Sequence, residues 1–317
     1  MAFNSLEKIM INNSGQWLLV RGKSTNNPLI LHVQAGPGLP MIPEAGTMEK
    51  LLHLENDYLV AYWDQRACGK SFSKKTDPGT INFSQLADDI IYCTKYLLEK
   101  YKKDKAILVG YSIGATLALM AAAKDRNIFD RLFLVGMDID VPTANKYAIE
   151  FVISKAKEKN NATLLKQAID LSNISITNAR QFQKRAKLLA DLGGIKKDSS
   201  YNQLLISTIS NMIFSKAYRL SDIPKTIKGM EYCQDALLPE FDTLNLFDRI
   251  KSIEVPVHFI HGKQDGVVPY QTAVKYYEYL QANKKTFTCF DNSAHMPHYD
   301  EPGKFAKLLR DTINNQG

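Results

Sequence analysis

A serine flanked by two glycines is the feature of this 317-residue sequence best suited to nucleophilic chemistry. Residues 110–114 read Gly-Tyr-Ser-Ile-Gly, between an apolar run at 106–109 and an Ala-rich helical pattern at 113–123. Glycines permit the sharp, strained turn that exposes such a serine. A helix that follows directs backbone N–H groups and the positive end of its dipole at a developing anion. Ser112 is therefore the predicted nucleophile. The alternative is a tightly packed glycine-rich turn without chemistry.

A serine hydroxyl is a weak nucleophile unless a base removes its proton, so the sequence must also supply a histidine. His295 lies in the loop after a predicted strand at 286–290, late in the chain, as the order nucleophile, acid, base requires. His298 is the competing candidate, and its other expected role is a side chain facing solvent or a covering lid. His32 and His261 fall within or at the end of strand patterns, where hydrogen-bonded structural roles are expected.

The acid of such a site should follow a late strand and precede the histidine. Asp265 stands after a predicted strand at 255–260 and 30 residues before His295, a spacing that accommodates one helix and one strand. It would accept the imidazole N–H, fix the tautomer and stabilise the imidazolium. A turn residue in the Asp-Gly pair is the alternative. Asp291 and Asp300 are too near the histidine in sequence to reach its far nitrogen.

An oxyanion formed at this serine needs two preorganised backbone donors. Ile113, directly after the nucleophile, is expected to supply one N–H. The loop at residues 34–38, after a predicted strand at 29–33, is expected to supply the other from Gly36. Pro37 has no N–H and stiffens this loop. A Gly-Pro-Gly turn without function is the alternative for this segment.

These residues require a scaffold that brings distant loops together. Short continuous apolar runs alternate with helical patterns, which indicates an α/β fold with a mostly parallel central sheet flanked by helices. One helix opens at Asn82 and carries apolar residues every three or four positions. The predicted strands are residues 29–33, 58–63, 106–109, 132–135, 255–260 and 286–290, and further helices are predicted at 113–123 and 272–280.

The pattern changes after Val141, where strand signals nearly vanish until about Asn245. Amphipathic helices replace them, with Phe182, Ala186 and Leu189 on one face of the third. The sequence therefore predicts an α/β core formed by residues 1–140 and 246–317, with a helical lid inserted at 141–245. The lid helices are expected at 147–157, 162–171 and 182–192.

Composition and charge bear on the partners and the location expected of the protein. The formal net charge is +7, but the basic residues are dispersed, so nucleic-acid binding is not expected. No run approaches the roughly 20 apolar residues of a membrane span, and the first residues do not read as a signal peptide, so a cytoplasmic location without membrane association is expected. The four widely spaced cysteines suggest free thiols. No metal or organic cofactor is expected. The apolar surfaces of the lid could support a homodimer.

Several segments together resemble the prolyl aminopeptidase (proline iminopeptidase) family of α/β-hydrolases. They are the loop 34–38, the Asp-Gln-Arg segment at 64–71, the serine motif at 110–114, Gly262 to Asp265, and Ala294-His295. The resemblance covers residues 16–140 and 246–310 and is poor across the lid. It implies the α/β-hydrolase fold with an inserted helical lid, and a Ser-His-Asp triad formed by the residues named above.

The sequence departs from the family at positions that bear on the substrate. Gln34 and Ala35 replace the usual His-Gly of the oxyanion loop, and Tyr111 and Ile113 replace the usual neighbours of the serine. Lid carboxylates hold the substrate's amino group in that family, and they cannot be aligned here. The acids available in this stretch are Glu231, Asp235, Glu240 and Asp242.

The predicted function is hydrolysis of an amide or ester bond in a small molecule or short peptide, through an acyl-enzyme. An aminopeptidase of the proline iminopeptidase type is the leading reading. A peptidase would need a carboxylate to pair with the substrate ammonium, since an unpaired buried charge is costly. A carboxylesterase-like enzyme with an apolar pocket is the alternative, and a non-catalytic ligand-binding protein on the same fold is the remaining one.

Overall fold

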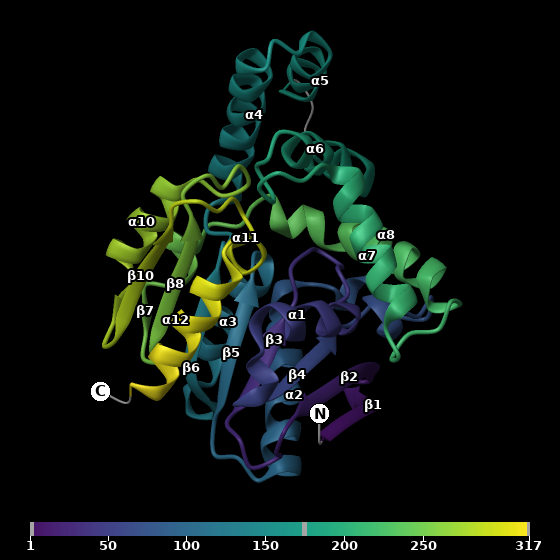
Figure 1. Ribbon diagram of the computed structural model, residues 1–317, viewed down its shortest axis with the longest axis vertical. Coiled ribbons are helices and arrows are strands. Elements are labelled where there is room, and N and C mark those ends of the chain that lie inside the picture. Colours follow the sequence, from purple (N-terminus) through teal and green to yellow (C-terminus); the bar gives the residue numbers. More distant parts are fainter. Residues whose placement is uncertain (1–2, 173–175, 316–317) are drawn as a thin grey trace.

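The computed structural model describes residues 3–172 and 176–315, and its centre is an eight-stranded sheet (Figure 1). The strand order is β1-β2-β4-β3-β5-β6-β8-β10, and all neighbours from β4 onward are parallel. The predicted mostly parallel sheet is thereby confirmed. The strands are β1 (Phe3–Ile11), β2 (Ser14–Gly22), β3 (Leu29–Val33), β4 (Leu59–Asp64), β5 (Ala106–Tyr111), β6 (Phe129–Val135), β8 (Val257–Gly262) and β10 (Lys285–Phe290), beside a small parallel pair, β7 (Ser252–Ile253) and β9 (Gln281–Ala282).

The antiparallel hairpin of β1 and β2 was not among the predicted strands. Asn12 and Asn13 form its turn, both with positive φ (44° and 62°), a conformation that asparagine tolerates better than most residues. Exposure alternates from residue to residue along β1, and Ile9 and Ile11 are buried. β2 then pairs antiparallel with β4, so the hairpin extends the parallel sheet at one edge.

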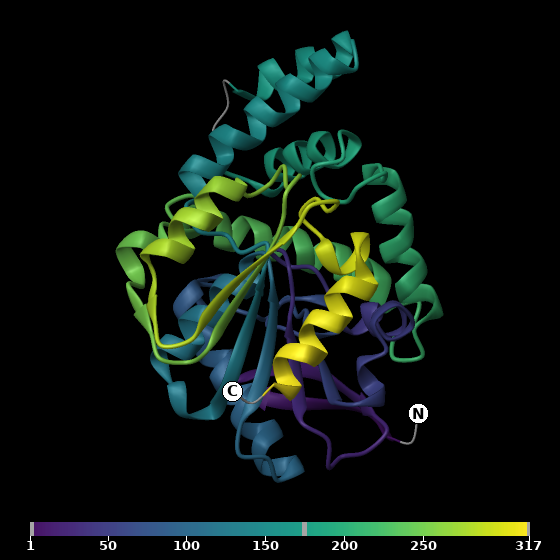
Figure 2. The ribbon, with the colours of Figure 1, turned by 60° about the vertical axis from the view of Figure 1, so that its left-hand side comes forward.

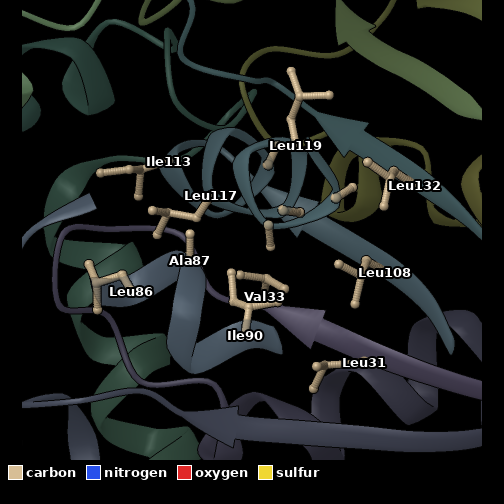
Figure 3. Close-up of a cluster of buried hydrophobic side chains, with 14 of the residues drawn as sticks. Leu31, Val33, Leu86, Ala87, Ile90, Leu108, Ile113, Leu117, Leu119 and Leu132 are labelled. Carbon is tan, nitrogen blue, oxygen red and sulfur yellow. The ribbon is translucent and has the colours of Figure 1, made fainter. Parts of the chain in front are cut away.

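Helices cover both faces of the sheet, as predicted. One hydrophobic cluster joins the sheet to α2 and α3, and Figure 3 shows Leu86 and Ile90 of α2 and Leu117 of α3 beside Leu31 and Leu108 of the strands. A second cluster lies on the opposite face beneath α1 and α12. The core helices are α1 (Ala45–Leu52), α2 (Phe83–Tyr101), α3 (Ile113–Lys124), α9 (Leu246–Arg249), α10 (Tyr270–Tyr279), α11 (Pro297–Asp300) and α12 (Pro302–Asn314).

The chain between β6 and β8 forms a helical layer over the carboxyl ends of the parallel strands (Figures 1 and 2). It leaves and returns at adjacent points, because Asp140 and Asn245 form an isolated antiparallel bridge. The helices of this layer are α4 (Val141–Glu158), α5 (Ala162–Ser172), α6 (Ala179–Asp191), α7 (Tyr201–Phe214) and α8 (Asp222–Phe241). The hairpin of α4 and α5 projects away from the rest of the molecule in both views.

This helical layer, called the lid below, contains its own apolar cluster, formed by buried residues of α4, α5 and α6 and Leu192. In contrast, α8 contributes Cys233, Leu237, Leu238 and Phe241 to the main core cluster. Across residues 3–172 and 176–315, no helix is both long and apolar enough to cross a membrane.

Candidate active site

Ser112 lies on a strained turn between β5 and α3. Its φ is +53° and its ψ −126°, a conformation that costs a non-glycine residue free energy and that concentrates at functional sites. A Cβ at Gly110 would lie 2.5 Å from the Cα of Ala115, and one at Gly114 would lie 2.2 Å from the carbonyl oxygen of Gln34. Both flanking glycines are therefore required, one for the turn and one for the contact with the 34–38 loop.

His295 and Asp265 are brought together from two loops. His295 Nδ1 lies 2.8 Å from Asp265 Oδ2, while Asp265 Oδ1 accepts the backbone N–H groups of Val267 and Val268 at 2.8 and 2.9 Å. Both side chains are buried, the carboxylate completely. The carboxylate is thus fixed before it meets the imidazole, and it favours the tautomer that leaves Nε2 free to accept a proton.

The protonation of His295 reflects opposing effects. Burial lowers its pKa, but the charge of Asp265, the hydrogen bond to it and the charge of Asp138 outweigh burial and raise the pKa above its ordinary value of 6.5. This imidazole is therefore a stronger base than one free in water.

Asp138, a residue that the sequence analysis did not select, completes the cluster. Ser112 Oγ donates a hydrogen bond to Asp138 Oδ2 at 3.0 Å. Thr116 Oγ1, on the next turn of α3, donates to the carbonyl of Asp138 at 2.6 Å. Gly136 has φ +55°, and a Cβ there would lie 3.0 Å from His295 Nδ1, so the loop after β6 passes directly beside the histidine. Burial raises the pKa of Asp138 to about 6.

In this arrangement the serine hydroxyl contacts a carboxylate rather than the histidine. Within the part of the chain that the structure describes, Ser112 Oγ forms no hydrogen bond with His295, whose hydrogen-bond partner is Asp265. Ser112, Asp138 and His295 nevertheless form one cluster, since the charge of His295 acts on Asp138. A rotation about the Cα–Cβ bond of Ser112 is what would transfer its hydroxyl from one partner to the other.

The two predicted oxyanion donors lie beside the serine. The close approach of Gly114 to Gln34 presses α3 against the 34–38 loop, and Gly36 lines the same cavity as Ser112. Ile113 is the first residue of α3, where backbone N–H groups have no partner within the helix. Among the described residues, neither Gly36 nor Ile113 has a backbone N–H engaged in a hydrogen bond. Both are therefore free to donate to a substrate oxygen.

The Asp-Gln-Arg segment supports this loop rather than entering the site. Asp64 Oδ1 accepts the N–H groups of Met41 and Ile42 at 2.8 and 2.9 Å, which anchors the chain just after the 34–38 loop. Arg66 forms a buried ion pair with Asp89 of α2 at 2.8 Å. The backbone N–H of Gln65 donates to Gln34 Oε1 at 3.3 Å, so this segment contacts the 34–38 loop through Gln65, whereas Arg66 joins the segment to α2.

The other histidines have structural positions. His298, the competing candidate, is buried against Tyr111, with ring centroids 4.4 Å apart, so the alternative of a side chain facing solvent is wrong for it. Burial keeps the pKa of His298 well below its ordinary value, so the ring is neutral. His32 contacts the Tyr111 hydroxyl at 3.0 Å. His261 Nε2 lies 3.1 Å from the carbonyl of Val268 and supports the Asp265 loop.

The cavity above Ser112 has both apolar and charged walls. It is small, about 30 Å³, and Val141, Ala144, Phe182, Phe241 and Val267 form most of its surface. Asp138 and Asn145 line it from the core side and α4, and Arg185 lines it from α6. Arg185 is buried, and sequence analysis did not select it either.

The four acids that are available in the lid sequence all lie away from the cavity of Ser112. Asp235 accepts the N–H of Ala179 at the start of α6, and Glu240 accepts the N–H of Phe83. Asp242 accepts from Asn145 Nδ2 at 2.9 Å, and Glu231 is exposed. None of these four lines the cavity of Ser112.

The parts of the chain that the structure describes contain no group of three or more histidine, cysteine or acidic side chains arranged to hold a metal ion.

The fold and the geometry around Ser112 define the class of protein, and comparison with known proteins agrees. The chain belongs to the alpha/beta hydrolase fold family, which it matches over residues 28–302. It is therefore a hydrolase.

Among individual proteins, it is similar to the probable aminopeptidase YbaC of Bacillus subtilis, with 28% identity over 96% of this chain and 94% of the relative. A shorter match, 37% identical over 59 residues, joins 19% of this chain to 22% of a putative esterase/lipase of Mycoplasma genitalium. A solved structure of a proline iminopeptidase-related protein from Thermus thermophilus covers 98% of both chains at 16% identity, with a TM-score of 0.64. The resemblance to prolyl aminopeptidases is thereby supported.

Signals for the two missed residues were present in the sequence. Asp138 follows a buried parallel strand, and the carboxyl ends of such strands are where sites form in α/β sheets. Arg185 stands three residues after Phe182, on the apolar face of its helix. A charged residue is uncommon on such a face and therefore indicates a specific role.

Proposed function

We propose that this chain is a serine hydrolase that acts through Ser112, His295 and Asp265, with the N–H groups of Gly36 and Ile113 as the oxyanion hole. The observation that carries the proposal is the 2.8 Å contact between His295 and Asp265 beside a serine held on a strained turn. These are the elements of an activated nucleophile: a serine, a base and a group that orients the base.

In the proposed reaction, the Ser112 hydroxyl turns from Asp138 toward His295 Nε2 and loses its proton to it as Oγ bonds to the substrate carbonyl carbon. The negative charge moves to the carbonyl oxygen, where the N–H groups of Gly36 and Ile113 stabilise it. The imidazolium gives its proton to the leaving amine or alcohol as that bond breaks. Water, deprotonated by His295, then attacks the acyl-enzyme, and the proton returns to Ser112 as the acid leaves.

Aminopeptidase activity is the leading function, because Asp138 supplies the carboxylate that such an enzyme needs. The α-nitrogen of an aminoacyl substrate is two bonds from the carbonyl carbon that Ser112 attacks. A carboxylate 3.0 Å from Ser112 Oγ is therefore within reach of that ammonium. Pairing with it would also release the serine hydroxyl from Asp138. The similarity to a probable aminopeptidase along nearly the whole chain supports this choice.

A carboxylesterase-like enzyme is the second candidate. The cavity wall formed by Val141, Ala144, Phe182 and Phe241 is apolar, as a small ester would require. An esterase has no need of a buried carboxylate beside its nucleophile, so Asp138 favours the first candidate over this one.

The test compares prolyl and other aminoacyl arylamides, their Nα-acetyl derivatives and short-chain p-nitrophenyl esters. Ser112→Ala should abolish turnover, and the exposed Ser207→Ala on α7 is the matched control. Turnover of free-amino arylamides, but not of the acetylated ones, would establish the aminopeptidase. Turnover of esters alone would establish the second candidate. A wild-type protein that neither turns over any substrate nor reacts with a fluorophosphonate probe would show that the fold serves as a binding protein.

A further inference from the structure

The lid places a buried positive charge in the cavity of Ser112. Arg185, on α6, is 6% exposed and lines this cavity together with Ser112 and Asp138. Within residues 3–172 and 176–315, no hydrogen bond or ion pair involves its side chain, and its buried Nε has no acceptor. A buried charged donor without an acceptor, such as this Nε, destabilises a folded protein. The chain thus bears a cost at this position that packing does not explain.

The neighbours of Arg185 support its guanidinium group but do not accept its hydrogen bonds. Its Cζ lies 5.1 Å from the ring centroid of Phe182, so the aromatic face supports the guanidinium. Burial lowers the pKa of Arg185 to about 10, against the attraction of the charges of Asp138 and Asp242, so the side chain is charged at neutral pH. Asp138 accepts from Ser112 and Asp242 accepts from Asn145, and neither forms an ion pair with Arg185.

We propose that Arg185 binds a carboxylate of the substrate, so that the pocket is built for short peptides with a free C-terminus, in the simplest case dipeptides. The inference rests on the proposed function, in which Asp138 receives the substrate ammonium. A dipeptide carries the matching charges: an ammonium on the residue that acylates Ser112 and a carboxylate on the residue that leaves. The forked donors of a guanidinium suit a carboxylate, with two parallel N–H···O bonds.

The first measurement is binding rather than turnover. The Ser112→Ala variant is titrated by calorimetry with prolyl-glycine and with prolyl-glycinamide, which differ in the carboxylate alone. The dipeptide is expected to bind roughly ten- to hundredfold more tightly, as a charge-assisted hydrogen-bonded pair would give. Equal affinity for the two ligands would overturn the proposal.

The second measurement assigns the preference to Arg185. Introduced into the Ser112→Ala background, Arg185→Gln should bring the two affinities to within about twofold, because the amide cannot supply a positive charge. Arg180→Gln, an exposed arginine on the same helix, should leave the preference unchanged. A preference that survives Arg185→Gln in a variant with an unaltered circular dichroism melting curve would overturn the assignment. If that variant does not fold, Arg185→Lys replaces it, with a reduced preference expected and an unchanged one contradicting the proposal.

Failure of the proposed function has a different signature. It would appear as the absence of Ser112-dependent turnover of arylamides and esters by the wild-type protein, whatever the two ligands' affinities for Ser112→Ala. Conversely, Ser112-dependent turnover of arylamides, combined with equal affinity for the dipeptide and its amide, would leave the aminopeptidase standing and reject the carboxylate subsite.

Discussion

Asp138 and His295 both have pKa values above their ordinary ones, and each acts on the other. The charge of Asp138 raises the pKa of His295, and a positive His295 opposes the burial that raises the pKa of Asp138 to about 6. His295 must be neutral to accept the serine proton, whereas Asp138 must be ionised to bind an ammonium. Both requirements place activity on the alkaline side of the two transitions.

The first prediction concerns the base. Because the pKa of His295 is raised above 6.5, kcat/KM for an uncharged ester should rise with pH through a midpoint above 6.5. Asp138→Asn removes a charge that raises this pKa, so the midpoint should move to lower pH. A pH–rate profile of both proteins checks this. A midpoint that stays in place would mean that Asp138 does not act on His295.

The second prediction concerns the substrate. Protonation of Asp138 as the pH falls through about 6 removes its negative charge, so the KM for free-amino arylamides should rise below that pH. Above roughly pH 8 the α-amino group itself loses its charge, and KM should rise again. The matched Nα-acetyl substrates have no ammonium and serve as the control. The same KM profile for both kinds of substrate would contradict the role given to Asp138.

At the scale of elements, one buried ion pair joins three parts of the core. Asp89 of α2 receives Arg66 from the loop after β4, Asn12 from the hairpin turn and Gln16 from β2. The third prediction is that Arg66→Met lowers the free energy of unfolding by about 3–5 kcal/mol, because Asp89 is left buried without its cation. Lys124→Met, which removes an exposed pair with Asp88, should cost at most about 1 kcal/mol. Urea denaturation measures both.

The contact between α3 and the oxyanion loop yields a fourth prediction. Gly114→Ala would place a methyl group 2.2 Å from the carbonyl oxygen of Gln34, so the loop must shift. We expect about 1–3 kcal/mol of destabilisation and a kcat that falls more than KM changes, since the loop carries the Gly36 donor. Gly46→Ala, in α1 with open space around it, is the control and should be neutral or stabilising. A Gly114→Ala protein with wild-type kcat would remove Gly36 from the oxyanion hole.

Some of these elements could be predicted from the sequence, and others could not. Strands such as β3 and β5 were predictable because both of their faces are buried and their apolar runs are continuous. The β1–β2 hairpin was missed, since its signal is a weak alternation around an Asn-Asn turn. Chain order suggested the pairing of Asp265 with His295, but spacing could not reveal that Ser112 would contact Asp138, since the two approach only after folding.

For the whole molecule, the size of the cavity sets a condition on function. About 30 Å³ accommodates one or two water molecules, which is too little for an aminoacyl group. We therefore expect part of the lid to move when substrate enters. Most apolar residues of α4, α5 and α6 form a cluster of their own, and only Val141 and Phe182 among the described residues of these helices contact the main core cluster, whereas α8 contributes four buried residues to it. The moving part is thus expected to be α4 to α6, which carries Arg185, with α8 remaining in place.

The fifth prediction follows from that division. Amide hydrogen exchange followed by mass spectrometry should show α4, α5 and α6 exchanging through openings of lower free energy than those of β3, β5 and α8. Reaction of Ser112 with a bulky fluorophosphonate should change exchange in α6 more than in α8. Uniform protection of lid and core helices would contradict a moving α4–α6 unit.

The reactivity of the cysteines offers a chemical test of which part of the lid moves. Cys68 of the core and Cys233 of α8 face each other with sulfurs 3.9 Å apart, and both are buried. The hydrogen bond that the Cys68 thiol donates to Cys233, together with burial, raises the pKa of Cys68 well above its ordinary value, so the reactive thiolate is scarce. Alkylating reagents should therefore modify the partly exposed Cys289 first. If α8 stays in place during turnover, Cys68 and Cys233 will remain unmodified while substrate is consumed. Protection of Cys68 and Cys233 from alkylation during turnover thus reports that α8 does not open, and modification of Cys289 shows that the reagent is active.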